Sequence, residues 1–247
     1  MKTVEKIMTL VRQAGKIMLD ADRSSLGIAS KEGKGNFVTE YDKKVQDFLY
    51  KGLMEILPEA EFVGEEGEKD EAAFKGYTFI VDPIDGTANF VRDNHASAIS
   101  VGVLYDGEPH MGVVYNPYLD EMYYGKAGEG AFLNGKPIRV SDEPLENGII
   151  LFGTAPYYKE LSEQTFRIMY DYFKTGLDLR RSGSAALDLC SIAAGRAELF
   201  FEVILSPWDY AAAALILKEA GGIITAIDGS TLRFDDRCSV LAKNRED

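Results

Sequence analysis

The chain has 247 residues, of which 46% are hydrophobic and 27% charged, a balance typical of soluble globular proteins. Its 40 acidic residues outnumber the 27 basic ones, so the formal net charge is −13. Nucleic acids and anionic membranes bind basic surfaces, so this charge argues against either as the main partner. An acidic surface also repels a phosphorylated substrate, unless some carboxylates hold divalent cations that reverse the local charge.

The N-terminal residues 1–20 lack the continuous apolar run and the small-residue cleavage site of a secretory signal. The longest apolar run in the C-terminal half, 211–217, falls far short of the roughly 20 residues that span a bilayer. Cys190 and Cys238 form no CxxC pair, and we expect two buried thiols in a reducing compartment. These features predict a cytoplasmic protein.

Helical periodicity predicts a first, amphipathic helix over 2–21 and a second helix that follows 39–42 and ends at Pro58. A loop rich in Glu, Gly and Lys at 64–76 leads into a buried strand at 77–81. From 96 to 140, Asp-Gly and Asn-Gly pairs separate alternating apolar segments, a pattern typical of antiparallel hairpins. The expected strands there cover 98–104, 111–115, 121–124 and 138–140.

The polar segment 141–148, which contains a proline and a glycine, is the predicted boundary between a half at 1–140 and a half at 141–247. Beyond the boundary, strands alternate with helices. The expected strands lie near 149–153, 177–180, 197–201 and 222–226, and the expected helices cover 160–174, 184–194 and 209–220. This alternation favours an α/β half packed beside an α+β half.

The segment FIVDPIDGTANF at 79–90 carries the most informative pair of carboxylates. A buried strand delivers Asp82 and Asp85 at its exit, and Pro83 fixes one backbone angle between them. Two such carboxylates can share one divalent ion and reach a second, and the carbonyl of Ile84 can add another oxygen. Magnesium prefers ligands of this kind, so the segment predicts a magnesium site.

The turn after these carboxylates offers backbone donors. Gly86 lets the chain turn at no steric cost, and the amides of Gly86 and Thr87 would meet a phosphate oxygen if they open a helix. Taken alone, however, Asp, Pro and Gly are also common in ordinary turns. The isolated segment therefore leaves a metal site and a plain turn equally open.

Two other acidic segments could complete the site. Glu65 lies in the loop GEEG at 64–67, which on spacing alone favours a solvated acidic loop. Asp209 stands where a helix begins, and could be its N-cap. A capping carboxylate keeps its second oxygen free, so the cap and a metal ligand are compatible.

The segments GEE at 64–66, VDPIDGTANF at 81–90 and PWDYAAAALILKEAGG at 207–222 resemble the three signature blocks of the inositol monophosphatase family, in the same order. The similarity extends over nearly the whole chain. The resemblance implies a layered α-β-α-β-α sandwich, of mixed α+β and α/β character, with metals where the halves meet. It also implies a homodimer and a phosphatase that uses two or three Mg²⁺ ions per site and a metal-activated water to hydrolyse a small phosphorylated alcohol.

The resemblance also implies a role for individual residues. Glu65, Asp82 and the Ile84 carbonyl would bind one metal, while Asp82, Asp85 and Asp209 would bind a second. The expected catalytic residues are Glu65, Thr87 and Asp42, with Thr87 orienting the attacking water and bonded in turn to Asp42. Lys31 matches a lysine near the site. The expected substrate contacts are Asp85, Gly86, Thr87, Gly183, Ser184, Ala185, Glu202 and Asp209.

The chain departs from the family pattern at 90–98 and at 153–158, two segments expected beside the pocket. Inositol monophosphate is the first expectation for the substrate. The alternatives are a sugar bisphosphate, histidinol phosphate or a nucleotide 3′-phosphate. An alternative of another class is a non-catalytic, metal-dependent regulatory binding protein. His95, just beyond the main motif, is expected to be a surface or supporting residue rather than a proton donor.

Overall fold

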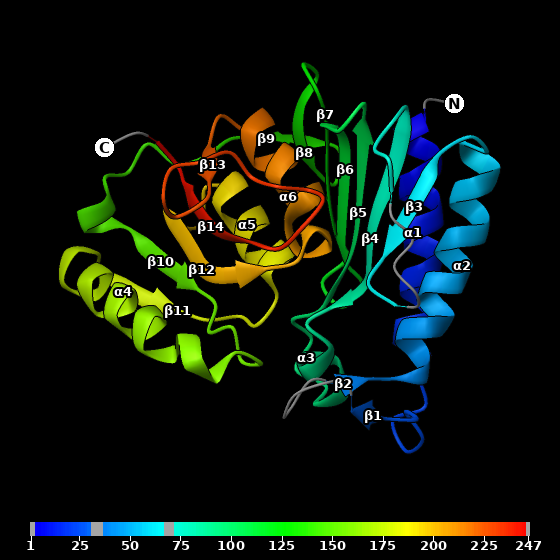
Figure 1. Ribbon diagram of the computed structural model, residues 1–247, viewed down its shortest axis with the longest axis horizontal. Coiled ribbons are helices and arrows are strands. Elements are labelled where there is room, and N and C mark those ends of the chain that lie inside the picture. Colours follow the sequence, from blue (N-terminus) through cyan, green and yellow to red (C-terminus); the bar gives the residue numbers. More distant parts are fainter. Residues whose placement is uncertain (1–2, 31–36, 67–71, 246–247) are drawn as a thin grey trace.

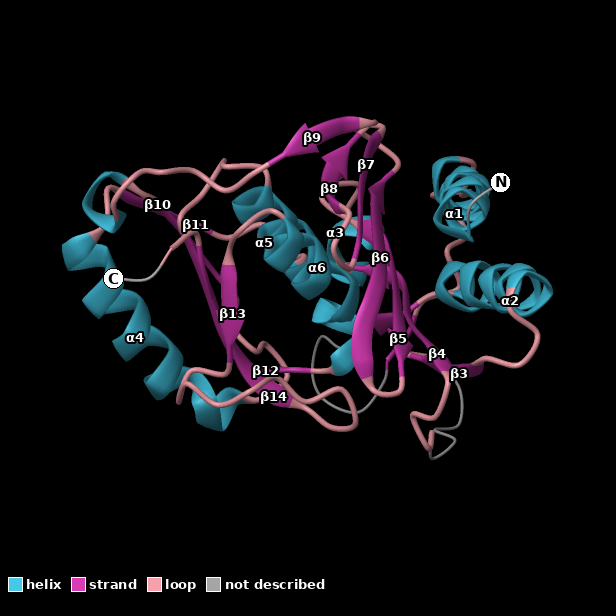
Figure 2. Cartoon of the chain, turned by 90° about the horizontal axis from the view of Figure 1, so that it is seen from above, coloured by secondary structure: helices cyan, strands magenta, loops and turns pink. Residues whose placement is uncertain are grey.

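The computed structural model describes residues 3–30, 37–66 and 72–245. Its elements form five layers in the order helix, sheet, helix, sheet, helix (Figures 1 and 2). The first layer holds α1 (Thr3–Leu19) and α2 (Glu40–Ile56), which pack together against one face of the first sheet. The expected layered sandwich is therefore confirmed.

The first sheet has seven strands in the spatial order β3-β4-β5-β6-β7-β8-β9. Only β3 and β4 run parallel, and every other neighbouring pair is antiparallel. The strands are β3 (Glu61–Gly64), β4 (Tyr77–Asp85), β5 (Ala98–Tyr105), β6 (Glu108–Asn116), β7 (Glu121–Lys126), β8 (Gly130–Leu133) and β9 (Lys136–Ile138). The turns at Asp106-Gly107 and Asn134-Gly135 have positive φ at both residues, as tight hairpin turns require.

The second sheet has five strands in the spatial order β11-β10-β12-β14-β13. Its strands are β10 (Ile149–Phe152), β11 (Asp178–Arg180), β12 (Leu199–Leu205), β13 (Ile223–Thr225) and β14 (Cys238–Lys243). The first three run parallel, whereas β14 is antiparallel to both β12 and β13. Three shorter elements belong to the first part of the chain: β1 (Ala29–Ser30) and β2 (Phe37–Val38), which pair with each other, and the helix α3 (Thr87–Val91).

Two helices, α5 (Ala185–Ala193) and α6 (Pro207–Glu219), lie between the sheets, and α4 (Ser162–Thr175) covers the outer face of the second sheet (Figure 2). Helix α6 is apolar on every side, as expected of a helix enclosed by other layers. Even so, no helix within the described ranges is long and apolar enough to cross a membrane. Because α5 and α6 join both sheets in one core, the division at 140–141 stays a prediction.

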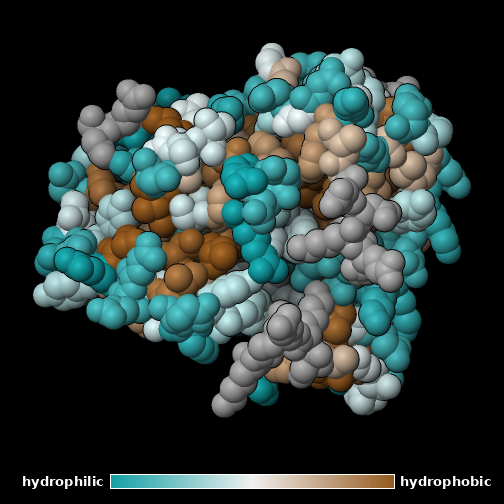
Figure 3. Space-filling view, viewed as in Figure 1, coloured by the Kyte–Doolittle hydropathy of each residue, from teal (hydrophilic) through white to brown (hydrophobic). Residues whose placement is uncertain are grey.

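Apolar side chains also reach the surface over α4 (Figure 3). Phe166, Tyr170, Phe173 and Leu177 are each more than half exposed, along one side of the helix and the turn that follows it. Among the cysteines, Cys190 is buried but Cys238 is only half-buried. The expectation of two buried thiols is therefore wrong for Cys238, which opens β14 at the end of a polar loop.

A row of glycines sets the distance between α6 and the first sheet. Gly102, Gly112 and Gly125 are register partners on β5, β6 and β7. A Cβ atom on Gly112 would lie 2.3 Å from the carbonyl oxygen of Ala212, and one on Gly102 would lie 3.0 Å from the Cβ of Ala211. The helix backbone thus rests almost directly on the sheet, because glycine faces alanine across the contact.

We predict that Gly112→Ala lowers the free energy of unfolding by about 1–3 kcal/mol, because the added methyl group overlaps the α6 backbone. Gly125→Ala is the matched control, since the nearest atoms lie 3.5 Å from its Cβ position, an ordinary contact. Urea denaturation of both variants measures the difference. Equal stability of the two variants would contradict the close approach of α6 at Gly112.

Candidate metal centre and substrate cavity

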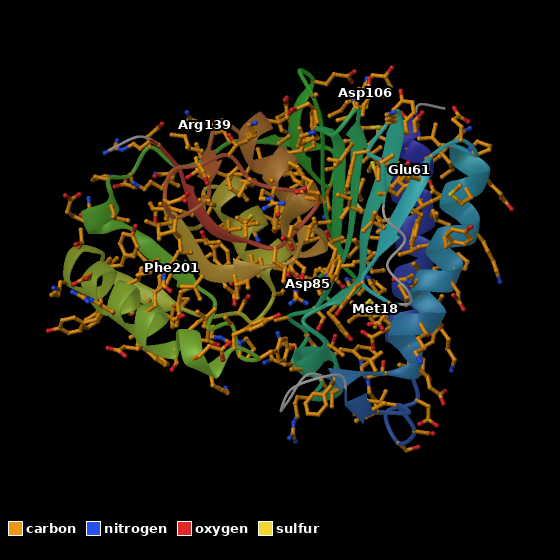
Figure 4. The ribbon with its side chains drawn as sticks, viewed as in Figure 1. Met18, Glu61, Asp85, Asp106, Arg139 and Phe201 are labelled. Carbon is orange, nitrogen blue, oxygen red and sulfur yellow. The ribbon has the colours of Figure 1, made fainter. Side chains whose placement is uncertain are left out.

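Three carboxylates meet where the first sheet joins the central helices. Oxygens of Asp82, Asp85 and Asp209 all lie within 4.8 Å of one another. Asp82 and Asp85 belong to β4, whereas Asp209 comes from the first turn of α6, more than a hundred residues later. Asp85 is labelled in Figure 4, where it lies between the two sheets.

An irregularity in β4 brings its two acids to the same side. Side chains three positions apart on a regular strand point to opposite faces of the sheet. The register between β4 and β5 shifts between Asp82 and Asp85, as in a β-bulge, which re-aims the side chains that follow it. The bulge therefore allows two carboxylates three positions apart to reach the same metal site.

Asp209 is the third residue of α6 and not its N-cap, so the N-cap interpretation is wrong. Ser206 caps the helix, because Pro207 can occupy the first helical position. The Oδ2 atom of Asp209 accepts a hydrogen bond of 2.7 Å from the backbone amide of Ser206. This capping box uses one carboxylate oxygen and holds the other beside the two acids of β4.

Glu65 faces the same cluster from the loop after β3. Its amide donates to the carbonyl of Val81 at 3.1 Å, and the amide of Glu66 donates to Oε1 of Gln46 at 2.9 Å. These backbone bonds fix the loop beside the end of β4. The Glu65 side chain is hydrogen-bonded to Asp82, and its charge also acts on Asp209.

The four acids repel one another, and Asp82 and Asp85 are buried. Burial raises the pKa of Asp82 well above its ordinary value, and the neighbouring charges of Glu65 and Asp85 raise it further. The pKa of Asp209 is raised for the same reasons, burial first and then Asp85. A divalent cation would relieve this repulsion, and a purely oxygen donor set suits a hard ion. The residues therefore fit a divalent metal.

The structure also brings Asp42, Ile84 and Thr87 together. The Thr87 hydroxyl lies 3.2 Å from Oδ1 of Asp42 and 3.2 Å from the carbonyl oxygen of Ile84. The other oxygen of Asp42 accepts bonds from the amide and the hydroxyl of Thr39, at 2.7 Å and 2.6 Å. Burial raises the pKa of Asp42 to about 6 despite these bonds. Asp42 is thus a fixed acceptor for the Thr87 hydroxyl.

Gly86 precedes the first turn of α3 with a φ of 85°, so the chain does open a short helix at Thr87. A Cβ atom at position 86 would lie 2.9 Å from the Ala96 carbonyl and 3.2 Å from the Gly183 carbonyl. Both the conformation and the space therefore require glycine here.

A cavity of about 150 Å³ opens from the carboxylate cluster. Its wall contains all the expected substrate contacts, which are Asp85, Gly86, Thr87, Gly183, Ser184, Ala185, Glu202 and Asp209. A larger hollow of about 660 Å³ lies elsewhere, beside Glu198 and Lys243, and contains none of the expected site residues. The chemistry of the lining, rather than the size, identifies the smaller cavity as the candidate site. Lys31 lies outside the described residues.

The start of α5 is tied to the end of β4 through Asp85. Its Oδ2 atom accepts bonds from the Ser184 hydroxyl, at 2.6 Å, and from the Ala186 amide, at 2.8 Å. Burial raises the pKa of Asp85 to about 6, although these bonds oppose the increase. One carboxylate thus belongs to the acidic cluster and also positions the substrate side of the cavity.

Glu202 is held by the segment at 153–158, one of the two segments that depart from the family pattern. The amide of Ala155 donates to Oε1 of Glu202 at 2.8 Å. A Cβ atom on Gly153 would lie 1.9 Å from Oε2 of Glu202, so only glycine leaves room for this carboxylate. Burial raises the pKa of Glu202 to about 7. The segment was expected beside the pocket, but its bond to Glu202 was not predicted, because its contribution is a backbone amide and an absent side chain.

Asp188 is a cavity residue that the sequence reasoning also missed. It lines the wall and is 4% exposed. Burial raises the pKa of Asp188 to about 8, and the negative charges of Asp85 and Glu202 contribute to the increase. A hydrogen bond from Ser182 lowers the pKa and so opposes the increase. The available signal was a single acidic residue within an otherwise apolar helix. His95 is not in this wall, but lies on the surface, stacked against Tyr118.

We predict that Asp188→Asn raises the free energy of unfolding, measured in a chelator, by more than about 1 kcal/mol at pH 8. The folded pKa of Asp188 lies above its ordinary value of 3.8, so the unfolded chain releases this proton first. The contribution of Asp188 to stability therefore falls as pH rises from about 4 to about 8, and the variant avoids this loss.

Denaturation at pH 5 and pH 8 measures the change. Asp178→Asn, at an exposed acid paired with Arg180, is the matched control and should show no such gain at high pH. A gain for Asp188→Asn that does not grow between pH 5 and pH 8 would contradict the buried position of this carboxyl.

Comparison with known proteins gives the family. Residues 1–247 match the inositol monophosphatase family model over the whole chain. The chain belongs to this family.

Its relatives include the inositol-1-monophosphatase of Bacillus subtilis, which is 35% identical over 95% of this chain and 89% of its own length. The Nus factor SuhB of Vibrio cholerae is 38% identical over 82% of this chain and 76% of its own length. Among solved structures, inositol monophosphate-bound SaIMPase-II has a TM-score of 0.83 at 30% identity, covering 99% of this chain and 90% of that one. The expectation of a phosphatase enzyme of this family is confirmed.

Proposed function

We propose that the protein is a magnesium-dependent phosphatase that hydrolyses the phosphomonoester of a small polyol, with inositol monophosphate as the first candidate. The observation that carries this proposal is the cluster of Asp82, Asp85 and Asp209, which opens into a cavity lined by a further buried carboxylate, Glu202. The similarity to SaIMPase-II, a protein solved with inositol monophosphate bound, supports the choice of substrate.

In this proposal the acidic cluster holds two or three Mg²⁺ ions. Glu65, Asp82 and the Ile84 carbonyl would bind one, and Asp82, Asp85 and Asp209 would bind another. Such ions offset the charge of a phosphate group and lower the pKa of water to near neutral. A serine or cysteine nucleophile is not needed for this chemistry.

Thr87 and Asp42 would orient the attacking water. The Thr87 hydroxyl can donate its proton to Oδ1 of Asp42, 3.2 Å away, which leaves its own lone pairs to accept a proton from water. A water held in this way keeps a lone pair free to face phosphorus. Asp42 therefore acts through Thr87, and its two bonds from Thr39 keep it in place.

The remaining wall would bind the alcohol. Glu202 would accept hydrogen bonds from its hydroxyl groups, and the backbone of Gly183, Ser184 and Ala185 would contact it from the other side. Gly86 and Thr87 line the same cavity as the carboxylate cluster, and their backbone would contact the phosphate. The phosphate would thus face the acids while the alcohol faces α5 and β12.

We predict that Asp85→Asn and Asp209→Asn each reduce kcat/KM by more than about 100-fold in saturating magnesium. Even outer partners of metal ligands cost 10- to 100-fold when replaced, and these residues would bind the ion directly. Asparagine keeps one oxygen to accept the bonds from Ser184 and Ser206, so we expect both variants to fold.

Phosphate release and thermal unfolding measure activity and folding separately, and Asp178→Asn at the surface is the control. If either folded variant turns over substrate as fast as the unsubstituted protein, the assignment of these carboxylates as metal ligands is ruled out.

The function itself is tested by phosphate release from a panel of esters, with magnesium and with a chelator. The panel contains inositol 1-phosphate, fructose 1,6-bisphosphate, histidinol phosphate and adenosine 3′,5′-bisphosphate. We expect magnesium-dependent release with inositol 1-phosphate preferred. Preference for another ester would correct the substrate, and no release from any ester by folded protein would overturn the proposal.

A regulatory binding role is the second candidate, because relatives of this chain include the Nus factor SuhB of Vibrio cholerae. A stoichiometric partner recovered together with no phosphatase activity would favour this role over catalysis. The homodimer expected from the family and the cytoplasmic location expected from the sequence stay predictions.

A further inference from the structure

The cavity wall on the alcohol side carries a second buried carboxyl group besides Glu202. Asp188 of α5 and Glu202 of β12 both line this wall, and they are 4% and 7% exposed. The charge of Glu202 acts on Asp188, so the two groups lie within electrostatic range of each other. None of the roles proposed above uses Asp188.

The position of Asp188 on α5 follows from helix geometry. Residues three and four apart share one helix face, so Asp188 lies on the same face as Ala185 and Ser184. Ser184 donates to Asp85, and Ala185 lines the cavity. Cys190, two residues after Asp188, lies on the other side of α5 and packs in the apolar core. The one acidic residue of this helix therefore faces the cavity.

The charge around Asp188 favours some alcohols over others. Arg181 is the only Lys or Arg among the described residues that line the cavity, and its charge acts on both Asp188 and Glu202. One guanidinium thus faces two carboxyl groups. A neutral alcohol with several hydroxyl groups can donate to these oxygens, whereas a second phosphate would meet like charge above about pH 8, where both carboxyl groups are ionised.

We propose that Asp188 is a specificity-determining residue, which together with Glu202 accepts hydrogen bonds from the hydroxyl groups of a neutral polyol and disfavours a second phosphate on the substrate. This inference rests on the proposed function and deepens it, because it selects a polyol monophosphate over a sugar bisphosphate. The competing explanation is purely structural: Asp188 would only fix the turn at Ser182 through their hydrogen bond.

The test compares three substrates with the purified protein in saturating magnesium. Inositol 1-phosphate has hydroxyl groups and one phosphate, fructose 1,6-bisphosphate has a second phosphate, and p-nitrophenyl phosphate has no hydroxyl group on its leaving group. At pH 9, where Asp188 is ionised, we expect Asp188→Asn to lower kcat/KM for inositol 1-phosphate about tenfold relative to p-nitrophenyl phosphate, mainly through KM, because an amide oxygen accepts a weaker hydrogen bond than a carboxylate.

At the same pH, this variant should raise the preference for fructose 1,6-bisphosphate over inositol 1-phosphate, because one negative charge leaves the wall. Asp178→Asn should change neither ratio, since that residue lies on the surface. Asp188→Ser serves the same comparison should the asparagine variant misfold.

Equal losses on all three substrates would show a structural role and overturn the inference, as would unchanged ratios. Both outcomes leave the proposed phosphatase intact, because p-nitrophenyl phosphate reports the reaction without the alcohol contacts. If the original protein releases phosphate from none of the three, the proposed function fails and this inference fails with it.

Discussion

The site depends on the close packing of α6 against the first sheet. A helix usually stands off a sheet by the length of its side chains, but Gly112 and Gly102 here face Ala212 and Ala211. The short distance places the first turn of α6 beside the end of β4, so that Asp209 reaches Asp82. Electrostatic repulsion among these acids destabilises the folded state, and the burial of apolar side chains along the rest of α6 offsets this cost.

Much of this could be predicted from local sequence. Strand and helix periods located most elements, and the signature blocks named the acids that the fold brings together. The β-bulge between Asp82 and Asp85 could not be predicted, because it depends on the pairing of β4 with β5. Short strands such as β3 and β14 were missed as well, since the neighbouring layers rather than their own residues make them strands. Asp209 was assigned to the N-cap because Pro207 was taken to precede the helix, whereas proline can also be the first residue of a helix.

The substrate side was harder to predict for a different reason. Glu202 is positioned by the Ala155 amide and by the missing side chain of Gly153, on the neighbouring strand and its loop. Neither feature has a chemical signature in one sequence, because every residue but proline has an amide and glycine serves many purposes. Asp188 had a signature, an acid in an apolar helix, but its meaning required knowing which face of α5 meets the cavity.

The bonds that Asp85 accepts from Ser184 and Ala186 have a mechanical consequence. They join the end of the first sheet to the helix that precedes β12 in the second. A hinge motion that opened the two sheets would have to break these bonds and expose the glycine-lined contact of α6. These contacts therefore argue against a hinge closure of the two sheets around the substrate. The walls that the two sheets give the cavity are thus held at a fixed separation by Asp85 and its two bonds.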